Sequence, residues 1–153
     1  IARRLVILAA EDIGMADPQA LSVAVAAQQA VHFVGMPEGR IPLAEATVYL
    51  ATAPKSNSAY KAVDAALDDV QRTRNDPVPM HLRNAPTGLM REMGYGQGYK
   101  YTHDYPQHFT PTENLPERLQ GKRYYTPSDQ GYEKEVAERI RAWWGERKGE
   151  AGG

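Results

Sequence analysis

The stretch Asp17–Val34, DPQALSVAVAAQQAVHFV, predicts a helix that other helices can approach closely. Asp17 followed by Pro18 is typical of a helix start, because aspartate caps the free N–H groups of the first turn and proline fits the first helical position. The many alanines that follow present small side chains to a neighbour. The faces at residues 24–30 and 44–51 are both alanine-rich, and they could pack within one chain or between subunits.

Three further helices are expected around this stretch, at residues 1–12, 42–52 and 57–74. Gly14 ends the first of them, and Ser56 or Asn57 caps the last. The last also has the clearest amphipathic pattern, with one apolar face made by Tyr60, Val63, Ala66, Leu67 and Val70. The first half of the chain therefore predicts an antiparallel array of four short-linked helices.

Residues 77–125 are expected to form an irregular crossover rich in proline and tyrosine. Thr87 caps a short helix that ends near Met93, and one further helical turn is expected at residues 116–119. The run 126–129, TPSD, resembles a capping box and predicts a long last helix that reaches residue 147. The apolar edge of this helix is Val136, Ile140, Trp143 and Trp144. We therefore predict an all-α domain over residues 1–147 and a flexible tail over residues 148–153.

The composition excludes proteins that depend on cysteine chemistry and proteins with a membrane-spanning segment in this stretch. The 153 residues are 42% hydrophobic and 24% charged, with a formal net charge of −1, as in ordinary soluble globular proteins. No cysteine is present, so disulfides, thiolate zinc sites and cysteine nucleophiles are absent. No apolar run has the length of about 20 residues that spans a bilayer. The chain begins with isoleucine inside a helix-like run, which leads us to expect a fragment of a longer protein.

Motifs of catalytic or cofactor chemistry are not found. No Walker motif is present, and the glycines of residues 94–98 are interpreted as tight turns, so we expect no bound cofactor and no ATP hydrolysis by this chain. Adjacent Asp68 and Asp69 are interpreted as a solvated helix face. Ser56 and Ser58 are interpreted as capping residues. A metal-dependent enzyme remains one alternative, with His103, Asp104 and His108 as ligands if their loop folds back.

The second half of the crossover mixes aromatic and basic residues, a composition typical of single-stranded nucleic-acid binding. The candidate DNA or partner contacts are Arg83, Tyr95, Tyr99, Lys100, Tyr101, Tyr105, Lys122 and Arg123. The alternative is that the tyrosine rings are buried and pack the loop onto the helices.

Four blocks in order resemble one family: ARRLVILAAEDIGMADPQAL, VYLATAPKSNSAYKA, VPMHLRNAPTGLMREMGYGQGYKYTHD and RYYTPSDQGYEKEV. They are similar to the replication-associated recombination protein A family (RarA, also called MgsA), whose eukaryotic relative is the Werner-helicase-interacting ATPase. The blocks cover most of residues 2–136. The chain departs from the family at Ala10, usually serine, and at Gly88, often lysine. The second departure removes a positive charge from the short helix after Thr87.

The resemblance implies a function that the residue patterns do not. Members are cytoplasmic, nucleoid-associated bacterial AAA+ ATPases, related to clamp loaders, which act at replication forks with single-stranded DNA-binding protein. Their DNA-dependent motor, with ATP and Mg²⁺, lies N-terminal to the matched region. The matched region resembles a clamp-loader collar that assembles a homo-oligomer, expected to be a tetramer. The expected function is therefore oligomerisation, with a DNA- or partner-contacting module over residues 83–125 as the alternative and no membrane association.

Overall fold

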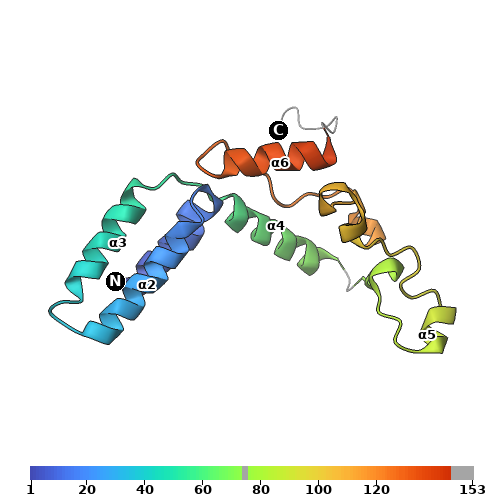
Figure 1. The fold of residues 1–153 in the computed structure, drawn as a ribbon, viewed down its shortest axis with the longest axis horizontal. Helices are drawn as coiled ribbons and strands as arrows, with labels where there is room; N and C mark the ends of the chain where they lie inside the picture. Colours follow the sequence, from blue (N-terminus) through green and yellow to red (C-terminus); the bar gives the residue numbers. More distant parts are fainter. Residues whose placement is uncertain (74–75, 146–153) are drawn as a thin grey trace. The chain divides into compact units, whose positions relative to one another are not determined.

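The structure is a computed structural model, which describes residues 1–73 and 76–145. Within these residues the regular structure is entirely helical, which confirms the predicted fold class (Figure 1). The α-helices are α1 Ala2–Leu8, α2 Gln19–Val34, α3 Arg40–Thr52, α4 Ser58–Arg72, α5 Gly88–Glu92 and α6 Glu133–Trp144. No helix among the described residues is both long and apolar enough to cross a bilayer. The chain divides into two units, residues 1–67 with 124–141 and residues 68–123 with 142–153.

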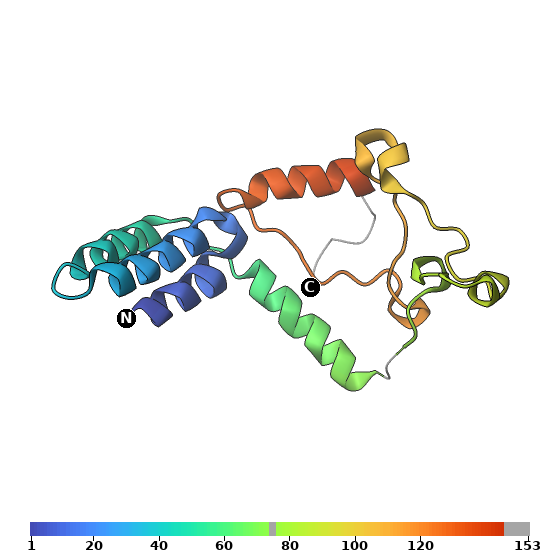
Figure 2. The same cartoon turned by 60° about the horizontal axis from the view of Figure 1, so that its bottom comes forward.

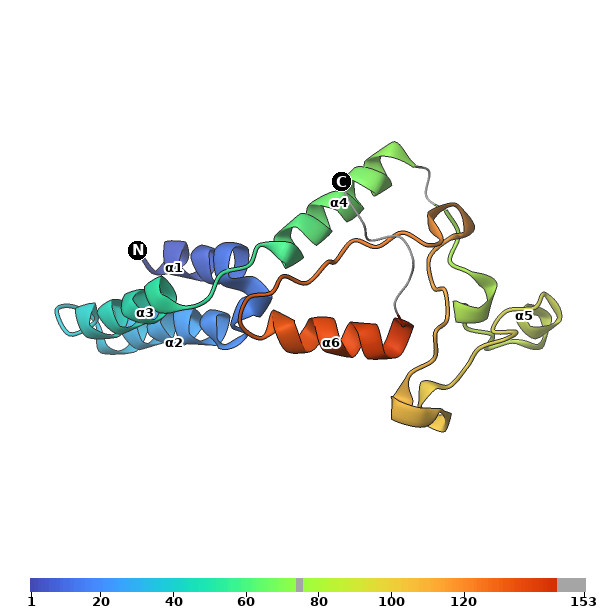
Figure 3. The same cartoon turned by 90° about the horizontal axis from the view of Figure 1, so that it is seen from above.

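Helices α1, α2 and α3 lie side by side and form the core of the first unit (Figure 3). The α2 helix begins as expected, since Asp17 Oδ1 accepts a hydrogen bond of 3.0 Å from the N–H of Gln19. The buried core residues of the three helices and the turn after α1 are Leu5, Ala9, Ile13, Ala20, Ala24, Ala27, Ala46 and Leu50. The small alanine side chains let the helices approach closely, so Ala24, Ala27 and Ala46 belong to the core of one chain.

The end of the first helix differs from the prediction of a single α-helix over residues 1–12. After Leu8 the chain continues as a π-helical turn, Ala9–Ile13, and then as a 3₁₀ turn, Gly14–Ala16. Gly14 adopts φ +50, and a Cβ atom there would lie 2.8 Å from the carbonyl oxygen of Ser56. The glycine therefore allows the segment before α4 to contact the end of the first helical segment closely.

The α4 helix forms where predicted, but its apolar face is not covered. Ser56 Oγ accepts a 3.2 Å hydrogen bond from the N–H of Ser58, so the predicted serine cap is confirmed. No residue of α4 is buried. The exposed fractions along the stripe are 45% for Tyr60, 52% for Val63, 51% for Leu67 and 61% for Val70.

The predicted start of the last helix is wrong. The helix begins at Glu133 instead of following the TPSD run, and residues 129–132 form a bend and a turn before it. Other acceptors occupy the backbone donors of this segment: the N–H of Ser128 bonds the Glu133 carboxylate at 2.7 Å, and the N–H of Tyr132 bonds the distant Ala16 O at 2.8 Å. The helix also ends earlier than the predicted residue 147, because it stops at Trp144 and Gly145 follows with a positive φ of 70. The predicted tail 148–153 lies outside the described residues.

The second unit contains α5 and short 3₁₀ turns. Thr87 Oγ1 accepts a 3.3 Å hydrogen bond from the N–H of Met90, which confirms the predicted cap. The turn expected at residues 116–119 forms as the 3₁₀ turn Glu117–Leu119. Trp143 and Trp144, the last two residues of α6, belong to this unit. The ring of Phe109 stacks on Trp143 at 5.0 Å and meets Trp144 edge-on at 5.1 Å.

Candidate functional site

Arg83 and Tyr95, two of the candidate contact residues, lie together in the second unit. The Nε–H of Arg83 donates a 2.6 Å hydrogen bond to the carbonyl of Val78, and its guanidinium carbon lies 5.1 Å from the centre of the Tyr95 ring. The neighbouring chain is held by a 2.9 Å bond from the N–H of Gly96 to Met80 O. Arg83 therefore has two partners within its own chain, one a cation–π contact.

Tyr99, Lys100, Tyr101 and Tyr105 are all exposed, so the alternative that these tyrosine rings are buried is wrong. The three tyrosines are 59%, 55% and 39% exposed in chain order. Successive tight turns hold this loop, through local backbone hydrogen bonds such as Asp104 N to Tyr101 O at 3.0 Å. The backbone of this loop thus satisfies its own polar groups locally.

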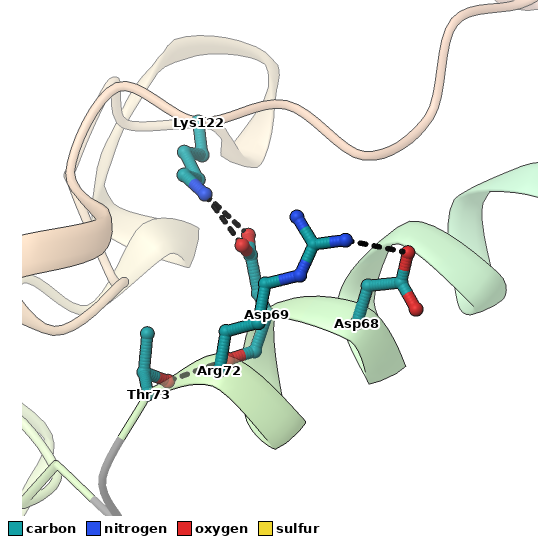
Figure 4. Close-up of polar contacts among 5 residues, drawn as sticks. All are labelled: Asp68, Asp69, Arg72, Thr73 and Lys122. Atoms are coloured by element: carbon teal, nitrogen blue, oxygen red, sulfur yellow. Dashed lines mark hydrogen bonds and ion pairs between the residues drawn. The ribbon is translucent and has the colours of Figure 1, made fainter.

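Lys122 is engaged by α4, and its charge is already compensated. Its Nζ lies 2.6 Å from both carboxylate oxygens of Asp69 (Figure 4). Arg72 pairs with Asp68 at 3.7 Å on the same helix. Asp68 is therefore solvated as expected, whereas the interpretation of Asp69 as solvated is wrong, because its side chain is only 15% exposed. Arg123 is exposed and also interacts within the chain. Lys100 is left as the basic candidate to which the structure assigns no partner among the described residues.

The histidines proposed as metal ligands do come together, but without a third ligand. The centre of the His103 ring lies 5.0 Å from that of His108 and 5.0 Å from that of Tyr101. Among the described residues, no three histidine, aspartate or glutamate side chains converge as metal ligands would. In the loop of residues 101–108, the rings of Tyr101, His103 and His108 are therefore close to one another and belong to exposed residues.

Glu133 is the principal residue that the sequence interpretation missed. Its side chain is fully buried at the first turn of α6. Oε1 accepts a 2.7 Å hydrogen bond from the Tyr125 hydroxyl, and Oε2 accepts one of 2.7 Å from the N–H of Ser128 and a longer one of 3.4 Å from Ser58 Oγ. The carboxylate thus connects the start of α6 to the start of α4, and Figure 2 shows the first turns of both helices close together. In sequence, Glu133 resembles the exposed Glu135 and Glu138, so no local signal marks it.

The environment of the carboxylate favours its charged form. Burial alone would raise the pKa of Glu133, but hydrogen bonds from Ser128, Ser56 and Tyr125 outweigh burial, and the pKa lies below its ordinary value. Burial and the bond to Glu133 raise the pKa of the Tyr125 hydroxyl, which keeps its proton available for donation. The charged Glu133 carboxylate thus accepts hydrogen bonds from neutral donors, the Tyr125 hydroxyl and the Ser128 N–H.

The lowered pKa of Glu133 predicts an acid-dependent loss of stability. The unfolded state takes up its proton near the ordinary glutamate pKa of about 4.3, at higher pH than the folded state does. The contribution of Glu133 is therefore complete above that value and is lost as pH falls through the folded pKa. Urea unfolding of the wild type and of Glu133→Gln at several pH values should show a stability difference that shrinks in acid. A difference that stays constant down to pH values well below 4 would contradict this assignment.

Comparison with known proteins gives one consistent result. The family model described as MgsA AAA+ ATPase C terminal matches residues 1–144. Replication-associated recombination protein A of Escherichia coli (strain K12) is 47% identical over 148 residues, which are 96% of this chain and 33% of that protein. An uncharacterized AAA domain-containing protein of Mycobacterium tuberculosis is 49% identical over 140 residues, 92% of this chain and 31% of its own length. The protein named ATPase WRNIP1 in Dictyostelium discoideum is 44% identical over 126 residues, 82% of this chain and 14% of its own length. The chain thus spans a third or less of the length of these relatives.

Proposed function

Because the chain belongs to the MgsA AAA+ ATPase C-terminal family, we propose that it is the assembly domain of a AAA+ ATPase acting in replication-fork maintenance, recombination and repair. The membership confirms the resemblance seen in the sequence motifs. The domain holds several copies together, so that the ATPase motors attached to it work as one assembly. A clamp-loader-like tetramer is the proposed arrangement.

The uncovered apolar stripe of α4 is the observation that supports this function. Tyr60, Val63, Leu67 and Val70 recur at spacings of three and four residues, which places them on one side of the helix. All four are between 45% and 61% exposed. Removing apolar surface from water stabilises an association by about 25 cal/mol per Å². A second copy of the chain would gain this stabilisation by covering the stripe.

Charged residues placed on the stripe should abolish the assembly. Light scattering of the wild type is expected to give a mass several times 17.0 kDa, and Val63→Glu with Leu67→Glu is expected to return it to 17.0 kDa, because each buried carboxylate would have to lose its hydration. Ala65→Glu is the matched control, since Ala65 is exposed on the opposite side of α4 and its variant should assemble as the wild type does.

A strictly monomeric wild type at high micromolar concentration would remove the assembly function. A double variant that assembles normally would instead show that the α4 stripe is not the interface. Far-UV circular dichroism of each variant separates loss of assembly from loss of folding.

The longer protein to which this domain would belong is proposed to carry an ATPase motor as well. The motor would bind ATP with Mg²⁺ and hydrolyse ATP when DNA is present, and this chain would not. Single-stranded DNA-binding protein and forked DNA are the proposed partners of the assembly. The proposed location is the bacterial cytoplasm at the nucleoid. The names of its relatives as replication-associated recombination proteins support the role in replication and recombination.

A DNA- or partner-contacting role of residues 83–125 is the second candidate function. It is favoured by the exposure of Tyr99, Lys100 and Tyr101, because exposed aromatic rings beside a cation are the groups that single-stranded nucleic acid uses for stacking and phosphate contact. It predicts that the wild-type chain binds single-stranded DNA at low salt.

A further inference from the structure

We propose that the row of rings Tyr101, His103 and His108 is a platform on which unpaired nucleobases stack. The proposal rests on the second candidate function and specifies which side chains carry it. The three rings follow one another at centroid distances of 5.0 Å, with interplanar angles of 46° and 53°. All three residues are exposed, so a ligand can reach them from solvent.

Backbone strain accompanies this arrangement. Gln107 adopts φ 58 and ψ 14, and His108 adopts φ 52, so two consecutive residues with side chains occupy the left-handed region. This conformation costs about 1–2 kcal/mol for each residue that is not glycine. In the same unit, Gly94 and Gly98 occupy positive φ without that cost. The chain therefore tolerates strain at the position where a side chain places an imidazole beside His103, and such local strain is typical of functional segments.

The charges around the row indicate that stacking, and not phosphate contact, carries the binding. Lys122 is paired with Asp69, and Arg83 is bound to Val78 O and Tyr95. Lys100 precedes Tyr101 in the sequence and is the cation nearest to the rings along the chain, and the carboxylate of Asp104, four positions later, offsets its charge. One or two phosphate contacts predict a weak salt dependence, because single-stranded binding falls with a log–log slope of about −0.7 for each phosphate contacted.

Fluorescence anisotropy with a labelled oligothymidylate of about 20 nucleotides, longer than most single-strand site sizes, tests the platform. Tyr101→Ala and His103→Ala should each weaken binding about fivefold or more, whereas Tyr101→Phe keeps the ring and should bind as the wild type does. His32→Ala removes an exposed imidazole from α2 and is the matched control for the histidine. Between about 50 and 200 mM salt, the wild-type affinity should fall roughly three- to sevenfold.

The outcomes separate the platform from the function on which it rests. If the wild type binds but the two alanine variants bind equally well, the platform is overturned and the contact lies elsewhere in residues 83–125. A salt dependence of about fiftyfold over the same range, as expected for four phosphate contacts, would also overturn it. If the wild type shows no binding even at low salt, both the platform and the second candidate function are removed.

Discussion

Replacing Glu133 by alanine is expected to lower the free energy of unfolding by about 3–5 kcal/mol, since a hydrogen bond to a charged group contributes about 1.5–3 kcal/mol. The substitution removes the acceptor of the Tyr125 hydroxyl and of the Ser128 N–H, each bound at 2.7 Å, and of the more distant Ser58 hydroxyl. These donors would remain in a space that the native protein keeps closed, because Glu133 has no exposed surface. Urea denaturation followed by far-UV circular dichroism measures the loss.

Two other variants show whether the loss comes from the buried carboxylate. Glu138→Ala removes an exposed glutamate from the same helix and should change the free energy of unfolding by less than about 0.5 kcal/mol. Glu133→Gln keeps one acceptor oxygen but places an amide NH₂ opposite a donor, so its cost should lie between those of the two alanine variants. If Glu133→Ala were as stable as Glu138→Ala, the carboxylate would not hold the starts of α4 and α6 together.

Gly131→Ala is the second substitution expected to have a large effect, about 3 kcal/mol or more, and it acts on the same junction. Gly131 adopts φ +49, which costs a residue with a side chain about 1–2 kcal/mol. A Cβ atom there would overlap the carbonyl oxygen of Ala16 and lie 2.8 Å from Pro54 Cγ. Relieving the overlap must displace the Ala16 carbonyl, which accepts the 2.8 Å bond from the N–H of Tyr132, and overpacking adds about 1–3 kcal/mol.

Thermal unfolding measures this effect, with Gly121→Ala as the control. Gly121 also has a positive φ, of +80, but no heavy atom lies within 4 Å of the position its Cβ would take. Its variant should be destabilised only by this conformational cost of about 1–2 kcal/mol, which lowers Tm by roughly 2–8 °C. Gly131→Ala, which adds the overlap, should lower Tm further. Equal shifts would mean that the contact of Gly131 with Ala16 and Pro54 does not constrain the turn.

The candidate contact surface was only partly predictable from the sequence. Exposed Tyr99 and Tyr101 were identified because aromatic and basic residues alternate there. The same pattern made Lys122 a candidate, although its ammonium group forms an ion pair with Asp69, which is 53 positions away in the sequence. The contact of the His103 and His108 rings accompanies left-handed backbone at Gln107 and His108, which is uncommon for residues other than glycine, so the sequence does not predict it.

The sequence by itself determined the family, the approximate positions of α2 to α5 and the caps at Asp17 and Thr87. Asp17 and Thr87 cap helices through hydrogen bonds to residues two or three positions away, and the stripe of α4 follows from the helical period. Such interactions are local, so they appear in the order of the residues.

Only the tertiary structure decided where α6 begins and which side chains are buried or exposed. It moved the start of α6 to Glu133, buried that glutamate and left the apolar face of α4 open. Each of these outcomes depends on groups far apart in the chain, such as the Ser58 hydroxyl and the Glu133 carboxylate, 75 positions apart. A glutamate that binds buried donors and one that faces water have the same side chain, and only the folded surroundings distinguish them.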